Sequence, residues 1–125
     1  MKNSVYGELI FNTGWKTAVD MPMFGKIVNV TVKLKAYYEK DGVTAEQEKA
    51  ISDFEATKVQ KLAIIEKLLN DCANGNAAER FKAKTLLFER DGSCALLCDD
   101  EENEDDGVAV CLVPVEEVMS QDEYL

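Results

Sequence analysis

The sequence contains no histidine, and this absence removes several kinds of functional site at once. Histidine is the commonest general base and a frequent metal ligand, because its pKa lies near neutrality. Ser-His-Asp and Cys-His catalysis are therefore excluded, as is a zinc site that needs imidazole. Carboxylates such as Glu8, Asp20 and Glu39 are dispersed along the chain, and nothing pairs them as acid and base. We therefore predict no catalytic residues and expect the protein not to be an enzyme.

Three other patterns are also missing from the chain. No hydrophobic run approaches the length of a membrane span, and the segment Met1–Gly7 has no apolar core of the kind found in signal peptides. These absences predict a cytoplasmic protein without a membrane partner. The seven glycines never cluster into a phosphate-binding loop, so we predict no cofactor.

The four cysteines are few and scattered, and no C-x-x-C pair occurs among them. We interpret them as small buried hydrophobic residues in a reducing compartment, with a disulfide or a thiolate metal site as the alternative. The alternation of Cys94, Leu96 and Cys98 predicts that these three side chains share one face of a strand. The full set is Cys72, Cys94, Cys98 and Cys111.

Acidic residues outnumber basic ones by 24 to 14, which gives a net charge of −10. Such a surface repels nucleic-acid phosphates and anionic membranes, so we expect neither as a partner. It attracts basic proteins and can accelerate their encounter. Solubility alone is the simpler explanation of an acidic composition.

The 125 residues are the length of one ordinary domain, and we assign residues 1–125 to a single α+β domain. Alternating apolar and polar residues predict an antiparallel sheet of about five or six strands, with one face packed and one open. The clearest strand runs from Lys26 to Tyr37. The other expected strands are Val5–Phe11, Trp15–Met21, Lys84–Arg90, Ser93–Cys98 and Gly107–Val113. Asp91-Gly92 predicts a hairpin, and the tail Val115–Leu125 is expected to dock on the sheet.

One long helix is predicted at about residues 44–73, lying on the apolar face of the sheet. Thr44 and Gln47 form a T-x-x-Q capping box at its start, and Asn74-Gly75-Asn76 supplies a left-handed stop. A single apolar stripe at helical spacing defines the packed face. It consists of Ile51, Phe54, Leu62, Ile65, Leu69 and Cys72.

The segment Asp99–Asp106 is the outstanding polar feature, since every position in it except Asn103 is a carboxylate. So many like charges must be solvated or neutralised. Three interpretations are open: a flexible solvated loop, a contact surface for a basic protein, or a calcium site. The calcium interpretation is weak, because Val113 occupies the position at which an EF-hand loop needs glutamate.

Five short motifs follow one another along the chain. They are Gly14-Trp15, Phe24-Gly25-Lys26, Asp41-Gly42-Val43-Thr44 with Gln47, Gly107-Val108-Ala109-Val110 with Pro114, and Gln121-Asp122-Glu123-Tyr124-Leu125. Through these motifs the chain resembles a family of small bacterial domains of unknown function, some of which look like immunity proteins that neutralise secreted toxins. The resemblance implies an α+β fold and toxin binding, and it offers no catalytic residues. Asp105-Asp106 stands where the family pattern has an acidic residue and a histidine.

The sequence therefore favours a non-catalytic, immunity-like binding protein that occludes a basic toxin domain. The alternatives are a divalent-metal-binding protein that uses the segment 99–106 and an interaction domain of undefined role. For the binding hypothesis, we predict contacts from the acidic segment and from polar positions of the open sheet face. These residues are Asp99, Asp100, Glu101, Glu102, Glu104, Asp105, Asp106, Asn29, Thr31, Lys33 and Lys35.

Overall fold

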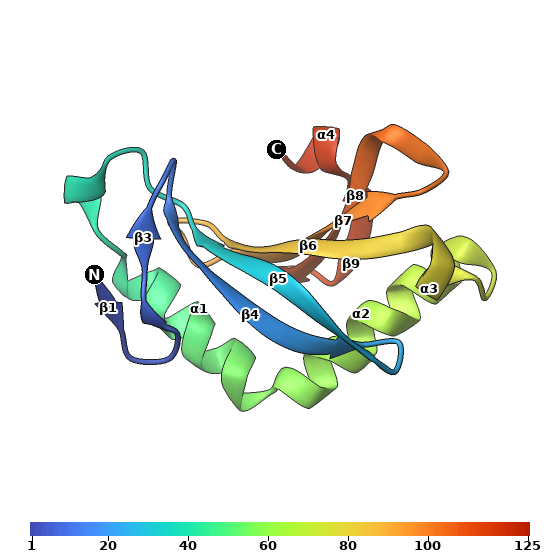
Figure 1. Cartoon of the computed structure of the whole chain (residues 1–125), viewed down its shortest axis with the longest axis horizontal. Helices are drawn as coiled ribbons and strands as arrows, with labels where there is room; N and C mark the ends of the chain where they lie inside the picture. Colours follow the sequence, from blue (N-terminus) through green and yellow to red (C-terminus); the bar gives the residue numbers. More distant parts are fainter.

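The computed structural model describes residues 1–125, and its main feature is a curved seven-stranded sheet with helices against one face (Figure 1). The strands lie side by side in chain order. They are β3 (Ile10–Phe11), β4 (Trp15–Met23), β5 (Lys26–Leu34), β6 (Phe81–Phe88), β7 (Cys94–Asp100), β8 (Asn103–Val113) and β9 (Glu117–Ser120). A separate small sheet pairs β1 (Lys2–Asn3) with β2 (Gly7–Glu8). The predicted α+β class is confirmed, with more strands than expected.

All neighbouring strands are antiparallel except β5 and β6, which run parallel and share four register pairs, from Thr31↔Thr85 to Leu34↔Phe88. The prediction of a wholly antiparallel sheet was therefore wrong at this one junction. A parallel pair needs a long crossover, and the segment between β5 and β6 supplies it. Its helical elements are η1 (Glu39–Asp41), α1 (Ala45–Ala56), α2 (Lys58–Ala73) and α3 (Ala77–Arg80).

The predicted long helix is two helices, because the chain leaves helical geometry at Thr57, where φ is −120° and ψ is 23°. The Thr57 hydroxyl donates to the Asp53 carbonyl at 2.7 Å, and the Thr57 N–H is shared between the Asp53 and Phe54 carbonyls. A hydroxyl that bonds back to a carbonyl one turn earlier bends a helix. The bend lets both helices follow the curved sheet (Figure 1).

The predicted ends of this helical region are confirmed. The Gln47 N–H donates to Thr44 Oγ1 at 3.0 Å, and the Thr44 N–H donates to Gln47 Oε1 at 2.9 Å. Asn74 adopts the left-handed conformation that ends α2, with φ 51° and ψ 39°. Along the predicted stripe, Cys72 is the exception, because its side chain is exposed while the other members are buried.

The predicted strand Val5–Phe11 is wrong, because the chain turns sharply there. The Asn3 side chain accepts the N–H groups of both Val5 and Tyr6, which closes a local turn after β1. Gly7 then has a positive φ of 76°, which favours glycine. Val5 points outward and is 41% exposed. Only Ile10–Phe11 joins the large sheet, as β3.

The two faces of the sheet differ as the alternation predicts. Val30, Val32 and Leu34 of β5 are fully buried under the helices, and Ala36 beyond the strand end is also buried. The predicted cysteine alternation is confirmed on the same face, where Cys94, Leu96 and Cys98 are buried. Their opposite face, called here the outer face, is open over β4 and β5.

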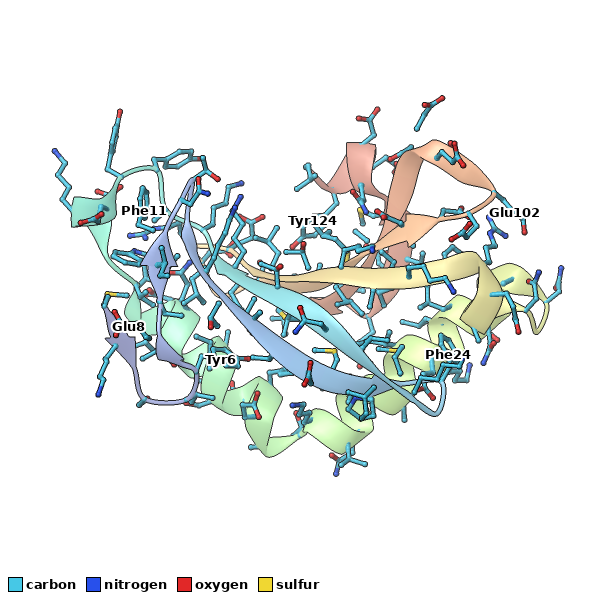
Figure 2. The ribbon with its side chains drawn as sticks, in the orientation of Figure 1. Tyr6, Glu8, Phe11, Phe24, Glu102 and Tyr124 are labelled. Carbon is cyan, nitrogen blue, oxygen red and sulfur yellow. The ribbon has the colours of Figure 1, made fainter.

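Over β7 to β9 the C-terminal segment covers the outer face. β9 pairs antiparallel with β8, and α4 (Gln121–Tyr124) follows it. Tyr124 points from α4 down towards the sheet (Figure 2). The expected docking of the tail is thus confirmed. No helix of the chain has the length and apolar character needed to cross a membrane.

Candidate binding surface

The acidic segment is a tight hairpin, not the loop that the sequence predicts. β7 continues to Asp100 and β8 begins at Asn103, which faces Asp100 across the ladder, so only Glu101 and Glu102 form the turn. The hairpin projects from the end of the sheet opposite the N-terminal strands (Figure 1). Strand alternation therefore distributes neighbouring carboxylates to opposite faces, which reduces their mutual repulsion.

Asp100 differs from the other carboxylates of the hairpin because its side chain is only 5% exposed. Arg80 binds it in a bidentate contact, from Nε at 2.9 Å and from Nη2 at 3.0 Å. The Glu102 N–H also donates to Asp100 Oδ1 at 2.9 Å. These hydrogen bonds, led by the guanidinium, hold the pKa of Asp100 below its usual range. Asp100 braces the turn and is not free to meet a partner.

A second brace links the hairpin to α4. Gln121 Nε2 donates to the Cys98 carbonyl at 2.8 Å and to the Val108 carbonyl at 3.3 Å, where the β7–β8 register shifts. Gly107 lies beside this contact, and a Cβ there would overlap the Cys98 carbonyl. The Asp122 N–H donates to Asp106 Oδ1 at 3.3 Å. The tail therefore fixes the base of the hairpin.

The remaining carboxylates of the hairpin face solvent. Only Glu102 forms an ion pair, with Arg80 Nε 3.7 Å from its Oε2, and Figure 2 shows Glu102 at the turn. Lys82 of β6 is the register partner of Asp99 but makes no ion pair with it. Asp122 and Glu123 of α4 add two exposed carboxylates beside the hairpin. The solvent-facing set on the hairpin is Asp99, Glu101, Glu102, Glu104 and Asp105, with Asp106 half-buried. We call this set the acidic hairpin.

Asn29, Thr31 and Lys33, the predicted positions of the open sheet face, do lie on the outer face of β5. Asn29 Nδ2 donates to Asp20 Oδ1 of β4 at 3.2 Å. Lys35 lies just beyond the strand end, and its ammonium contacts Glu89 at 3.3 Å. These residues stand on β5, two strands away from β7, so they and the acidic hairpin form two separate surfaces.

Sequence reasoning missed Arg80, Gln121 and the α4 carboxylates. The signal for Gln121 is faint: it is the one glutamine in an acidic tail. Nothing in the sequence pairs Arg80 with Asp100, because the contact crosses 20 residues and depends on the turn of α3.

No group of three or more Cys, Asp or Glu side chains converges in a geometry that fits a metal ion. The two braces explain this for the acidic segment, since Asp100 is turned towards Arg80 and its strand neighbours point to other sides. A hollow of about 640 Å³ lies elsewhere, between α1 and the β6–β7 turn. Phe54, Cys94 and Pro114 are among its lining residues, and both acids and lysines form its rim.

Comparisons of this chain with protein-family models, with curated proteins and with solved structures find no match.

Proposed function

We propose that this chain is a non-catalytic binding protein that presents the acidic hairpin to a basic protein partner and occludes part of that partner's surface. One observation carries the proposal: a braced hairpin holds a dense group of exposed carboxylates, of which only Glu102 forms an ion pair. Unneutralised like charges cost stability, and a basic partner removes that cost on binding.

The braces matter because a rigid surface loses less conformational entropy on binding than a flexible loop. Arg80 fixes the turn, and Gln121 fixes the base of the hairpin. The carboxylates are therefore held in place before the partner arrives. This argument favours a binding surface over a merely solvated loop.

The resemblance to immunity-like domains suggests the kind of partner, a basic toxin domain. Occlusion would then be steric, and the field of the acidic hairpin would accelerate the encounter. A steered association is fast at low ionic strength and slows as salt screens the charges, with a screening length of about 8 Å at physiological salt.

The test compares two variants that lose the same charge. The first, Glu101→Gln/Glu104→Gln/Asp105→Asn, neutralises the acidic hairpin. The control, Glu48→Gln/Asp53→Asn/Asp71→Asn, neutralises three exposed carboxylates of α1 and α2. Both are used with the wild type as bait in lysate of the native cell, supplemented with secreted proteins, and captured proteins are identified by mass spectrometry.

We expect one basic protein to be captured by the wild type and by the control and lost by the hairpin variant. With the purified pair, the association rate should fall at least tenfold between low and moderate salt. Equal capture by the hairpin variant would contradict the proposal, and so would an association rate that does not change with ionic strength.

A further inference from the structure

Two lysines face each other on the outer face of the sheet, at the end remote from the acidic hairpin. Lys16 of β4 is the register partner of Lys33 of β5, and both side chains are half-buried on the same face. Like charges directly opposite on neighbouring strands destabilise a sheet. Although the chain has a net charge of −10, neither lysine of this pair forms an ion pair, and the nearby Glu89 contacts Lys35 instead.

Both lysine side chains extend over the β3–β4 turn. Lys16 Nζ lies 3.4 Å from Thr13 Oγ1, and Lys33 Cε lies 2.9 Å from the place that a Cβ on Gly14 would occupy. Gly14, with φ 133°, leaves the room that the Lys33 stem needs. The turn therefore gathers two ammonium groups above one patch of the sheet.

No carboxylate oxygen lies within 4.0 Å of either ammonium group. The neighbouring Lys35 shows the contrast, since Glu89 neutralises it at 3.3 Å. Burial, together with the nearby Lys16 and Lys35 charges, lowers the pKa of Lys33, and the charge of Glu89 opposes this only in part. Neither ammonium group of the Lys16–Lys33 pair has a carboxylate in direct contact.

Exposed apolar and aromatic residues lie on the segments that adjoin the pair, and Ile10 is the register partner of Lys16. The Leu34 carbonyl lies 3.3 Å from the Cβ position on Gly14, so the segment after β5 leaves the sheet directly beside the turn. That segment carries Tyr37 and Tyr38, which are 74% and 65% exposed, and Ile10 on the edge strand β3 is 70% exposed. Exposed tyrosines next to cations are typical of protein-binding surfaces.

We propose that this turn end is a docking site for an acidic segment of another protein, with a carboxylate bound between Lys16 and Lys33 and apolar contacts to Tyr37, Tyr38 and Ile10. The site is separate from the acidic hairpin and does not rest on the function proposed above. The two surfaces lie towards opposite ends of the long axis (Figure 1). The charge on the hairpin is screened over that separation at physiological salt.

A protein segment fits this surface better than a nucleic acid. Binding to a phosphate backbone needs an extended basic track, whereas here one uncompensated lysine pair lies in a strongly acidic molecule. The lysine pair is sufficient to bind a single carboxylate of a protein segment. The partner side chains next to that carboxylate can then contact the exposed Tyr37, Tyr38 and Ile10.

The test uses a capped peptide of six glutamates, with the six-glutamine peptide as reference and a short oligothymidine as a second probe. Binding is followed by NMR shifts of residues 13–16 and 33–38. The variant Lys16→Met/Lys33→Met keeps the side-chain stems and removes both charges. Its control, Lys49→Met/Lys67→Met, removes two charges from exposed helix positions.

We expect the glutamate peptide to shift these residues saturably, and the dissociation constant to rise at least tenfold in Lys16→Met/Lys33→Met but not in the control. The same variant should raise Tm by about 1–2 °C, because a like-charge pair is removed. Unchanged affinity in this variant would overturn the proposal, as would preferred binding of the oligothymidine. If the wild type self-associates and Lys16→Met/Lys33→Met does not, the site binds a second copy of the chain, and the proposal is also overturned.

Discussion

Among single residues, Asp100 is the carboxylate whose role in the folded protein differs most from the exposed role that the acidic sequence predicts. Its neighbours in the sequence are also acidic, yet only Asp100 is buried against Arg80. A buried carboxylate needs a counter-charge and hydrogen bonds, and Arg80 provides both. The composition of the segment predicts an acidic surface, but it does not separate the bracing carboxylate from the exposed ones. That choice depends on α3, which places Arg80 beside the turn.

Replacing Arg80 by methionine should lower stability and change its dependence on pH. The pKa of Asp100 is lowered in the folded protein, so the unfolded chain takes up this proton at a higher pH. The contribution of the contact is therefore complete above the ordinary Asp pKa of about 4, and it is lost as pH falls through the lower folded value. Urea unfolding of wild type and Arg80→Met between pH 7 and pH 3 measures this.

The control for that experiment is Lys84→Met, which removes an exposed positive charge from β6. We expect Lys84→Met to keep the acid-dependent loss of stability and Arg80→Met to show less of it. If all three proteins lose stability in parallel with acid, the Arg80–Asp100 contact does not stabilise the fold.

Gly107 offers a second prediction at the same scale. A Cβ there would overlap the Cys98 carbonyl and come within 2.5 Å of Gln121 Nε2. Gly107→Ala should therefore destabilise the fold by about 1–3 kcal/mol, as overpacking does. It should also loosen the tail, which limited proteolysis of residues 117–125 would detect. Gly75→Ala is the control: it strains the backbone, because φ is 96° there, but its Cβ meets nothing within 4 Å, so it should lower stability without loosening the tail. If residues 117–125 of Gly107→Ala resist proteolysis as well as those of the wild type, the contact beside Gly107 does not brace the tail.

Among the elements, α1 is joined to the sheet by one fully buried polar side chain. Gln47 Nε2 donates to the Lys35 carbonyl at 3.0 Å and to the Phe88 carbonyl at 3.1 Å, while its Oε1 accepts the Thr44 N–H. The capping box thus also connects the helix start with β5 and β6.

Gln47→Leu should cost about 1–3 kcal/mol, because buried polar groups lose a partner. Gln47→Glu should cost more, since a carboxylate would face two carbonyl oxygens. Thr44→Ala, which removes the cap acceptor and the hydrogen bond from the Thr44 hydroxyl to the Arg90 carbonyl, should cost about 1–2 kcal/mol. Chemical denaturation of the three variants gives the order. A Gln47→Glu protein as stable as Thr44→Ala would contradict this account of Gln47.

Local patterns predict much of the element structure. Alternation in β5 identified its buried face, and the Thr44–Gln47 and Asn74 signals identified both ends of the helical region. Non-local pairing was not predictable, because no local signal sets β5 parallel to β6 across a 46-residue crossover rather than antiparallel to another strand. The break at Thr57 was missed because the apolar stripe continues through it. The turn after Asn3 was missed because Val5, Leu9 and Phe11 imitate a strand.

For the molecule as a whole, the fold gives the four thiols different reactivities. Burial raises the pKa of Cys94 and of Cys98 to about 12, and it raises the pKa of Cys111 as well. Cys72 is exposed on α2. Because the thiolate is the reactive form, we expect one fast thiol per native chain at neutral pH, in a titration with a disulfide reagent. Cys72→Ser should abolish this fast phase, and a second fast thiol would contradict the burial.

The parallel junction between β5 and β6 has a consequence for how the sheet opens. Each side of it is an antiparallel meander. Among the strands β4 to β8 the junction has the fewest register pairs, four, whereas β4 and β5 share nine. Sub-global opening follows the weakest boundary between cooperative units. Native-state hydrogen exchange should therefore divide the chain into two groups of amides, residues 15–34 and residues 85–113, each opening with its own free energy. The helices and Gln47 would hold the two halves of the sheet together while the hydrogen bonds between β5 and β6 open.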